Sequence, residues 1–86
     1  MIEDLRRQID KIDRKIVGLL NNRAKVALEI GDQKKRFDLD IVDSSREEEV
    51  ITGVKKMNGG PFSDEQITEI YRKIIAETKN LEREVC

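Results

Sequence analysis

This sequence contains no histidine and no tryptophan, and it has only one proline and one cysteine, Cys86. Histidine is the commonest general base and metal ligand, so its absence removes the usual route to both kinds of site. A single cysteine forms neither a disulfide nor a cysteine metal cluster within one chain. A catalytic triad is therefore excluded, and the sequence predicts no metal site.

Long apolar runs are also missing. No stretch approaches the roughly 18 apolar residues of a membrane span, and the first residues lack the apolar core of a signal peptide. We therefore expect a cytoplasmic protein without a membrane partner, and the 86 residues fit one domain over residues 1–86. Aromatic residues make up only 3% of the chain, and the resulting thin core favours oligomerisation.

Neither sign of charge dominates the composition. Seventeen basic residues oppose 18 acidic residues, which gives a net charge of −1, although 41% of the residues are charged. Nucleic-acid-binding domains usually carry a basic excess, so we expect no nucleic-acid partner. Any anion-binding site must come from the local placement of cations.

Apolar residues recur at alternating steps of three and four along the first third of the chain. The line consists of Ile2, Leu5, Ile9, Ile12, Ile16, Leu19, Val26 and Ile30, and Arg23 occupies one of its core positions. Four proline-free heptads predict one helix from about residue 3 to about residue 36. At about 1.5 Å per residue, this helix is roughly 50 Å long, which exceeds the width of a domain of this size.

Two shorter helices are predicted after a loop over residues 37–42. The second helix starts at two overlapping capping boxes within residues 44–48, and it ends at Asn58-Gly59-Gly60-Pro61. Its apolar side consists of Val50, Ile51, Val54 and Met57. Ser63, with Gln66 three residues later, starts the third helix. The expected fold class is all-α, with three helices per protomer.

The long apolar stripe of the first helix needs a partner of equal length. The shorter helices, of about 14 and about 22 residues by the same periodicity, cover only part of it. A second copy of the first helix, running antiparallel, would cover the rest. The sequence therefore predicts an intertwined helical homodimer.

Charged side chains fall on the inward face of the first helix. Arg23 and Lys34 are three turns apart and point the same way, about 16 Å from each other along the axis. The first turn of the second helix adds three inward polar residues, Asp43, Arg46 and Glu47, and the third helix adds Thr78 and Glu82. Because arginine binds carboxylates bidentately, this set describes a pocket for a small anion with more than one carboxylate.

Arg23 also has a purely structural interpretation. A charged residue at a core position fixes helix register, and Glu82 or Glu47 would then be its ion-pair partner. Arg6 lies about 25 Å from Arg23 along the same helix and cannot reach the same pocket in the same chain. It is either an ordinary solvated charge or a residue that an antiparallel dimer carries into the partner's pocket.

Three segments, LRRQIDKIDRKIVGLLNNRAKVALEIGDQKK, VDSSREEEV and IYRKIIAETKNLERE, resemble the all-helical class of chorismate mutase. The resemblance covers essentially the whole chain. It implies a three-helix protomer, an intertwined homodimer with two shared sites, and the rearrangement of chorismate to prephenate on the route to Phe and Tyr. That reaction is an intramolecular isomerisation and requires no cofactor.

The resemblance also implies roles for individual residues. Arg23 holds one substrate carboxylate with Thr78 beside it, and Arg6 of the partner subunit grips the other carboxylate. Lys34 contacts a carboxylate and the ether oxygen. The remaining pocket residues are Arg46, which adds positive charge, and Asp43 and Glu47, which lie near the substrate hydroxyl.

Glu82 and Asp32 depart from the family pattern. Glu82 stands where many members carry glutamine, and a carboxyl group donates a hydrogen bond to the ether oxygen only when it is protonated. Our hypothesis is that Glu82 acts in its protonated form, together with Lys34 and Arg23. Asp32 replaces a common lysine and is expected to face solvent.

Three alternatives share parts of this pattern. An isochorismate-pyruvate lyase of the same fold would use most of the same pocket residues, and a mutase could act on the amino analogue of chorismate. A non-enzymatic coiled-coil dimerisation module is compatible with the heptads. Such a module has no need for charges on two inner faces or for the Gly-Gly-Pro break.

Overall fold

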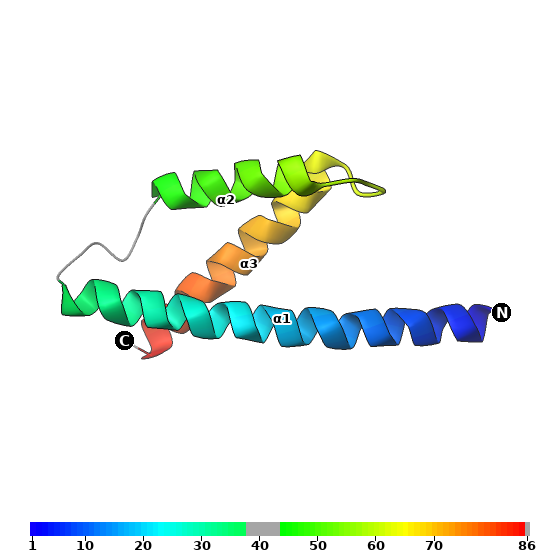
Figure 1. Cartoon of the computed structure of the whole chain (residues 1–86), viewed down its shortest axis with the longest axis horizontal. Helices are drawn as coiled ribbons and strands as arrows, with labels where there is room; N and C mark the ends of the chain where they lie inside the picture. The colour runs from blue at the N-terminus through cyan, green and yellow to red at the C-terminus, as the bar shows by residue number, and fades with distance from the viewer. Residues whose placement is uncertain (38–43, 86) are drawn as a thin grey trace.

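The computed structural model describes residues 1–37 and 44–85, and within these ranges the chain forms three α-helices. α1 spans Ile2–Arg36, α2 spans Ser44–Met57 and α3 spans Asp64–Val85 (Figure 1). The predicted all-α class is confirmed, and the three helices lie close to their predicted bounds. None of the described helices is long and apolar enough to cross a membrane.

α1 is continuous through both of its glycines, as the uninterrupted heptads predict. Its 35 residues extend for about 52 Å at 1.5 Å per residue, which accounts for most of the 55 Å long axis of the molecule. Acidic Glu3 and Asp4 occupy its first turn, and basic residues 34–36 occupy its last turn. Both placements oppose the partial charges of the helix dipole and so stabilise the ends.

The connection between α2 and α3 is fixed by side-chain hydrogen bonds. The Asn58 amide nitrogen donates to the carbonyl oxygen of Phe62 at 2.8 Å, and its amide oxygen accepts from the Gly60 nitrogen at 3.2 Å. Gly60 has a φ of 74°, a left-handed conformation that favours glycine. Ser63 and Gln66 form the predicted capping box, with reciprocal bonds of 3.1 Å and 3.0 Å.

α3 packs against both α2 and α1 and so joins the other two helices (Figure 1). The core of this unit is small: among the described residues, the buried side chains are Val54 of α2 and Thr68 of α3. Val50 and Ile51 are half-buried, as predicted for the apolar side of α2. Met57, predicted on that same side, is 75% exposed at the end of the helix.

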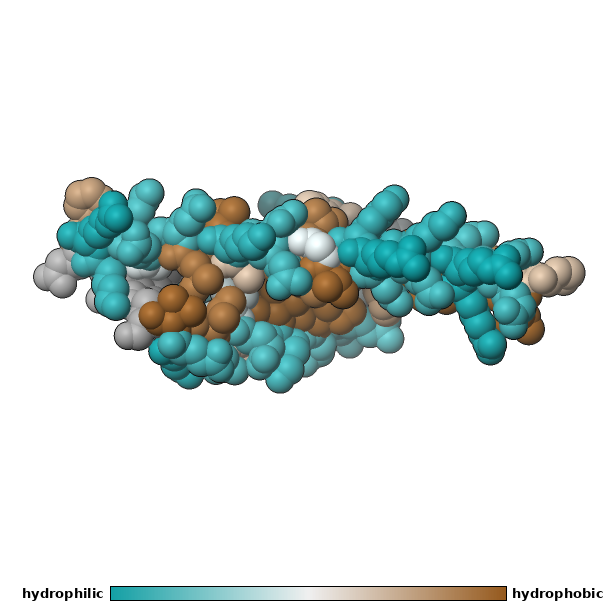
Figure 2. Space-filling model, turned by 90° about the horizontal axis from the view of Figure 1, so that it is seen from below, coloured by the Kyte–Doolittle hydropathy of each residue, from teal (hydrophilic) through white to brown (hydrophobic). Residues whose placement is uncertain are grey.

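The N-terminal half of α1 extends beyond α2 and α3 and leaves its apolar stripe uncovered. Exposed fractions range from 47% to 66% for Ile2, Leu5, Ile9, Ile12, Ile16 and Leu19. The side of α1 away from α2 is largely hydrophilic, with apolar side chains visible along its edges (Figure 2). The structure therefore exposes a long row of apolar side chains on α1, as expected of a chain that associates through this helix.

Candidate active site

A cavity of about 560 Å³ lies between the C-terminal half of α1, the first turns of α2 and the C-terminal half of α3. Its polar lining consists of Arg23, Lys34, Arg46, Glu47, Thr78, Lys79, Glu82 and Arg83. Its apolar lining includes Val26, Ala27, Ile30, Val50 and Ile75. Six of the predicted site residues thus come together around one space, with contributions from all three helices.

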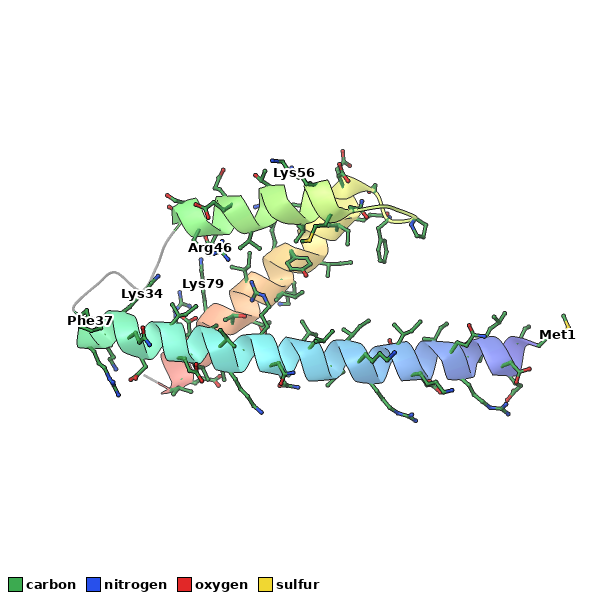
Figure 3. All side chains as sticks on the ribbon, viewed as in Figure 1. Met1, Lys34, Phe37, Arg46, Lys56 and Lys79 are labelled. Atoms are coloured by element: carbon green, nitrogen blue, oxygen red, sulfur yellow. The ribbon has the colours of Figure 1, made fainter. Side chains whose placement is uncertain are left out.

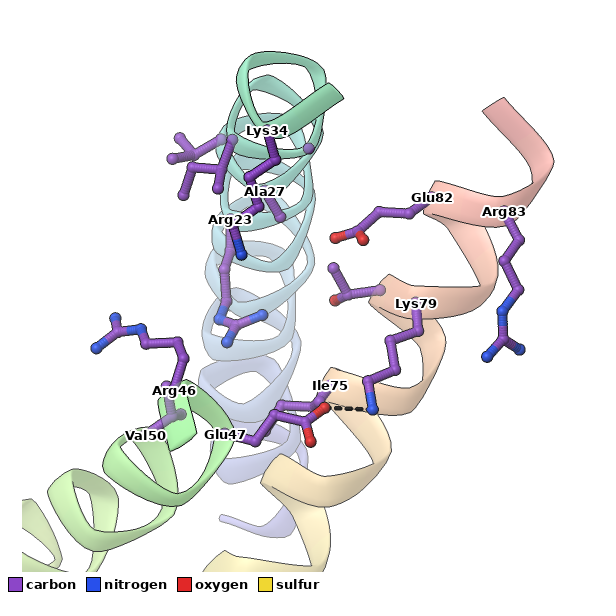
Figure 4. Close-up of a pocket in the computed structure, with 14 residues that line it drawn as sticks. Arg23, Ala27, Lys34, Arg46, Glu47, Val50, Ile75, Lys79, Glu82 and Arg83 are labelled. Carbon is purple, nitrogen blue, oxygen red and sulfur yellow. Dashed lines mark ion pairs between the residues drawn. The ribbon is translucent and has the colours of Figure 1, made fainter. Parts of the chain in front are cut away.

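α1 supplies two of the cations. Arg23 and Lys34 are half-buried and line the same cavity, which confirms that they share one face of the helix. The Arg23 guanidinium reaches toward the space between α1 and α3 (Figure 4). Within the described ranges, neither residue has a carboxylate partner within 4 Å, so the structural interpretation of Arg23 as an ion pair with Glu82 or Glu47 finds no support.

α3 supplies Thr78 and Glu82, one helical turn apart. Glu82 is half-buried, and its carboxyl group is directed toward α1 across the cavity (Figure 4). The Thr78 hydroxyl donates a hydrogen bond to the carbonyl oxygen of Ile74 at 2.7 Å. Its oxygen remains able to accept a hydrogen bond, and it must leave Ile74 in order to donate to a carboxylate.

α2 supplies Arg46 and Glu47 from its first turn. An Arg46 guanidinium nitrogen pairs with Glu49 of the same helix at 3.2 Å, and the side chain points away from Glu82 in Figure 4. Glu47 forms an ion pair with Lys79 of α3, so this carboxylate is held across the α2–α3 interface. In Figure 3, Lys34, Arg46 and Lys79 lie around the space between the end of α1 and the start of α2.

Arg6 does not line this cavity. Arg6 is an exposed residue near the start of α1, far along the same continuous helix from Arg23. That position agrees with the expectation that it cannot reach the pocket of its own chain. Asp43 lies outside the described residues.

The cavity contains two cations that the sequence did not identify as site residues, Lys79 and Arg83. Lys79 is four residues after Ile75 and three before Glu82, so it belongs to the face that carries both. Helical spacing therefore gives the face of α3 that carries Lys79, but it does not show that this lysine meets a carboxylate of α2.

The charge of the cavity favours an anionic ligand. Five basic side chains and two acidic ones line it, and apolar residues form much of the remaining wall. Several cations spaced along one pocket are suited to a molecule with two carboxylates, which they could hold in one conformation. The lining residues suit a reaction driven by positioning and electrostatic stabilisation.

Comparisons with known proteins identify the family of this chain. The family model described as chorismate mutase type II matches residues 5–83. The chain is 39% identical over 88 residues to a bifunctional chorismate mutase/prephenate dehydratase of Aquifex aeolicus, with 98% of this chain and 24% of that protein aligned. It is 27% identical to a chorismate mutase of Methanocaldococcus jannaschii, with 96% of this chain and 85% of that protein aligned.

A solved structure shows the same arrangement of helices. The structure of chorismate mutase (form II) from Thermus thermophilus matches with a TM-score of 0.93 at 34% identity, covering 95% of this chain and 93% of that one. The chain spans only 21% to 24% of the length of the bifunctional relatives that it matches. With the family model matching nearly its full length, this three-helix chain belongs to the chorismate mutase type II family.

Proposed function

We propose that this chain catalyses the rearrangement of chorismate to prephenate, an isomerisation in the biosynthesis of phenylalanine and tyrosine. One observation carries the proposal: Arg23 and Lys34 line one cavity with Glu82 opposite, and within the described ranges neither cation has a carboxylate partner. The substrate is a dicarboxylate and would supply the missing negative charges. Membership of the chorismate mutase type II family supports the same reaction.

The reaction is a pericyclic shift within one molecule. The ether C–O bond breaks while a C–C bond forms, and no proton has to be removed or added. The protein must therefore select the folded, chair-like conformer in which the two reacting carbons are close. It must also stabilise the negative charge that grows on the ether oxygen as the bond breaks.

The cavity offers groups for both tasks. Arg23 pairs with one carboxylate and, with Thr78 nearby, fixes one end of the substrate. Lys34 donates to a carboxylate and to the ether oxygen, where its positive charge stabilises the transition state more than the ground state. Protonated Glu82 donates a second hydrogen bond to that oxygen. Arg46 adds positive charge, Glu47 accepts a hydrogen bond from the substrate hydroxyl, and Asp43 is predicted to lie near that hydroxyl.

The second carboxylate is assigned to Arg6 of a partner subunit. The uncovered stripe of α1 supports a homodimer in which two α1 helices run antiparallel and bury each other's apolar residues. In that arrangement the start of one α1 approaches the end of the other, and Arg6 enters the partner's cavity. The cytoplasmic location and the single-domain organisation stay predictions from the sequence.

The direct test follows chorismate loss by absorbance and identifies prephenate as the product. We expect activity from the unaltered chain and a loss of about 100-fold or more in kcat/KM for Arg23→Ala, because a charged hydrogen-bonding partner of the substrate is removed. Lys34→Ala should lose as much, whereas Lys35→Ala, an exposed neighbour, should retain activity. Isochorismate serves as the competing substrate, and pyruvate release from it in place of prephenate formation would refute the proposal.

A further inference from the structure

We infer that Lys79 is a positioning residue of this site, and that its ion pair with Glu47 orients the carboxylate that recognises the ring hydroxyl of the substrate. The inference rests on the proposed function and adds a source of substrate specificity to it. Lys79 is not among the residues for which the family resemblance implies a role.

The Lys79–Glu47 contact differs in kind from ion pairs elsewhere in the structure. The Lys79 ammonium and Oε1 of Glu47 join α3 to α2, and the two side chains are 36% and 29% exposed (Figure 4). Pairs such as Asp4–Arg7 and Lys73–Glu77 instead join neighbouring turns of one helix, with at least 59% of each side chain exposed. The Lys79–Glu47 pair is therefore a tertiary contact at the pocket wall.

Burial gives this contact a structural reason. Oε1 of Glu47 is removed from solvent, and a buried carboxylate oxygen without a partner is strongly unfavourable. Lys79 supplies the partner and fixes the rotation of the carboxylate. The second oxygen, Oε2, is then the one left to accept a hydrogen bond from a ligand.

The pair also resolves an electrostatic conflict. Glu47 lines a cavity that we propose for a dianion, and an uncompensated carboxylate there would repel the substrate. An ammonium group on Oε1 offsets that repulsion without occupying the acceptor that faces the hydroxyl. Glu47 can thus discriminate for a hydroxyl group in a site otherwise selective for carboxylates.

A direct contact between Lys79 and a substrate carboxylate is the competing explanation, and the two make different predictions. Loss of a direct contact weakens every dicarboxylate equally. Loss of the positioning contact weakens every dianion slightly through the uncompensated charge of Glu47, and it weakens ligands that present the ring hydroxyl much further. A chorismate analogue with hydrogen in place of that hydroxyl therefore separates the two explanations.

The experiment measures kcat and KM for chorismate, and inhibition by the deoxy analogue, in four proteins: the unaltered chain, Lys79→Met, Lys79→Arg and Lys73→Met. Lys73→Met is the matched control because it removes an exposed ion pair from the same helix without touching the cavity. Melting temperatures of all four establish that each variant is folded.

We expect Lys79→Met to raise KM for chorismate by roughly 10-fold with little change in kcat, since the lost contact serves ground state and transition state alike. Its affinity for the deoxy analogue should fall by clearly less, about 2- to 3-fold, because only the charge compensation of Glu47 is lost for that ligand. Lys79→Arg should restore most of the chorismate affinity, and Lys73→Met should resemble the unaltered chain.

Three outcomes would overturn the inference while leaving the proposed function intact. These are Lys79→Met kinetics equal to those of Lys73→Met, an equal loss of affinity for chorismate and the deoxy analogue, and an effect on melting temperature alone. No conversion of chorismate by the unaltered chain would instead refute the proposed function, and the inference with it.

Discussion

Thr78 and Ile74 are joined by a hydrogen bond in which the threonine hydroxyl donates to the carbonyl oxygen one turn earlier, at 2.7 Å. Thr68 makes the same bond to Asp64, also at 2.7 Å, in the same helix. Thr78 lines the cavity, whereas Thr68 is buried and does not line it. The two threonines therefore form a matched pair in which only one side chain lines the cavity.

Replacing Thr78 by valine should weaken substrate binding by a modest factor. In the unaltered chain, the Thr78 hydroxyl must give up its hydrogen bond to Ile74 before it donates to a carboxylate, so the net gain from this contact is small. We therefore expect Thr78→Val to raise KM by about 3- to 10-fold. Thr68→Val keeps the shape of the residue and should leave KM unchanged. Steady-state kinetics on both variants make the comparison, and equal KM values for the two would remove Thr78 from the site.

Glu82 should make the reaction faster in acid. A carboxyl group donates to the ether oxygen only when protonated, and an ionised one would oppose the negative charge developing there. We expect kcat to be higher in more acidic buffers, and Glu82→Gln to remove that dependence, because an amide donates whatever the pH. Rate–pH profiles of both proteins test this, and superimposable profiles would count against a protonated Glu82.

Arg6 and Arg23 should complement each other between subunits. Arg6→Ala and Arg23→Ala each remove one cation from both sites of the proposed dimer, and each variant alone should be nearly inactive. In a mixed dimer both lesions fall in one site and the other site is intact, so up to about half of the activity per mixed dimer should return. Activity that stays absent after unfolding and co-refolding of the two variants would argue against a shared site.

Gly31 should show opposite effects on stability and activity. It is buried within α1 and lines the cavity, and a methyl group added there meets no atom within 4 Å. Alanine favours the helix over glycine, so Gly31→Ala should raise the free energy of unfolding by about 1 kcal/mol and the melting temperature by roughly 4–8 °C. The methyl group narrows the cavity, so kcat/KM should fall, and unchanged kinetics would show that the substrate does not approach this turn.

The helices could be predicted from the sequence because they depend on local signals. The heptads of α1, the capping box at Ser63 and the Asn58 turn each operate within a few residues, and all three are present. The same holds for Arg23 and Lys34, whose common face follows from helical geometry alone.

Lys79 could not be recognised in the same way. Lysine is mostly solvated, and its position next to Thr78 in the sequence carried no indication of a partner. The contact with Glu47 depends on how α2 packs against α3, which the spacing within one helix does not report. Asp43 lies outside the described residues, so its predicted role beside the substrate hydroxyl stays a prediction.

In the proposed dimer, the uncovered stripe of α1 would link catalysis to protein concentration. If the pocket is completed only when a second α1 arrives, turnover per molecule should decline on dilution below the dissociation constant, and the midpoint of thermal unfolding should decline with it. Chorismate would then stabilise the dimer, since a ligand bound by residues of both subunits favours the assembled state by mass action.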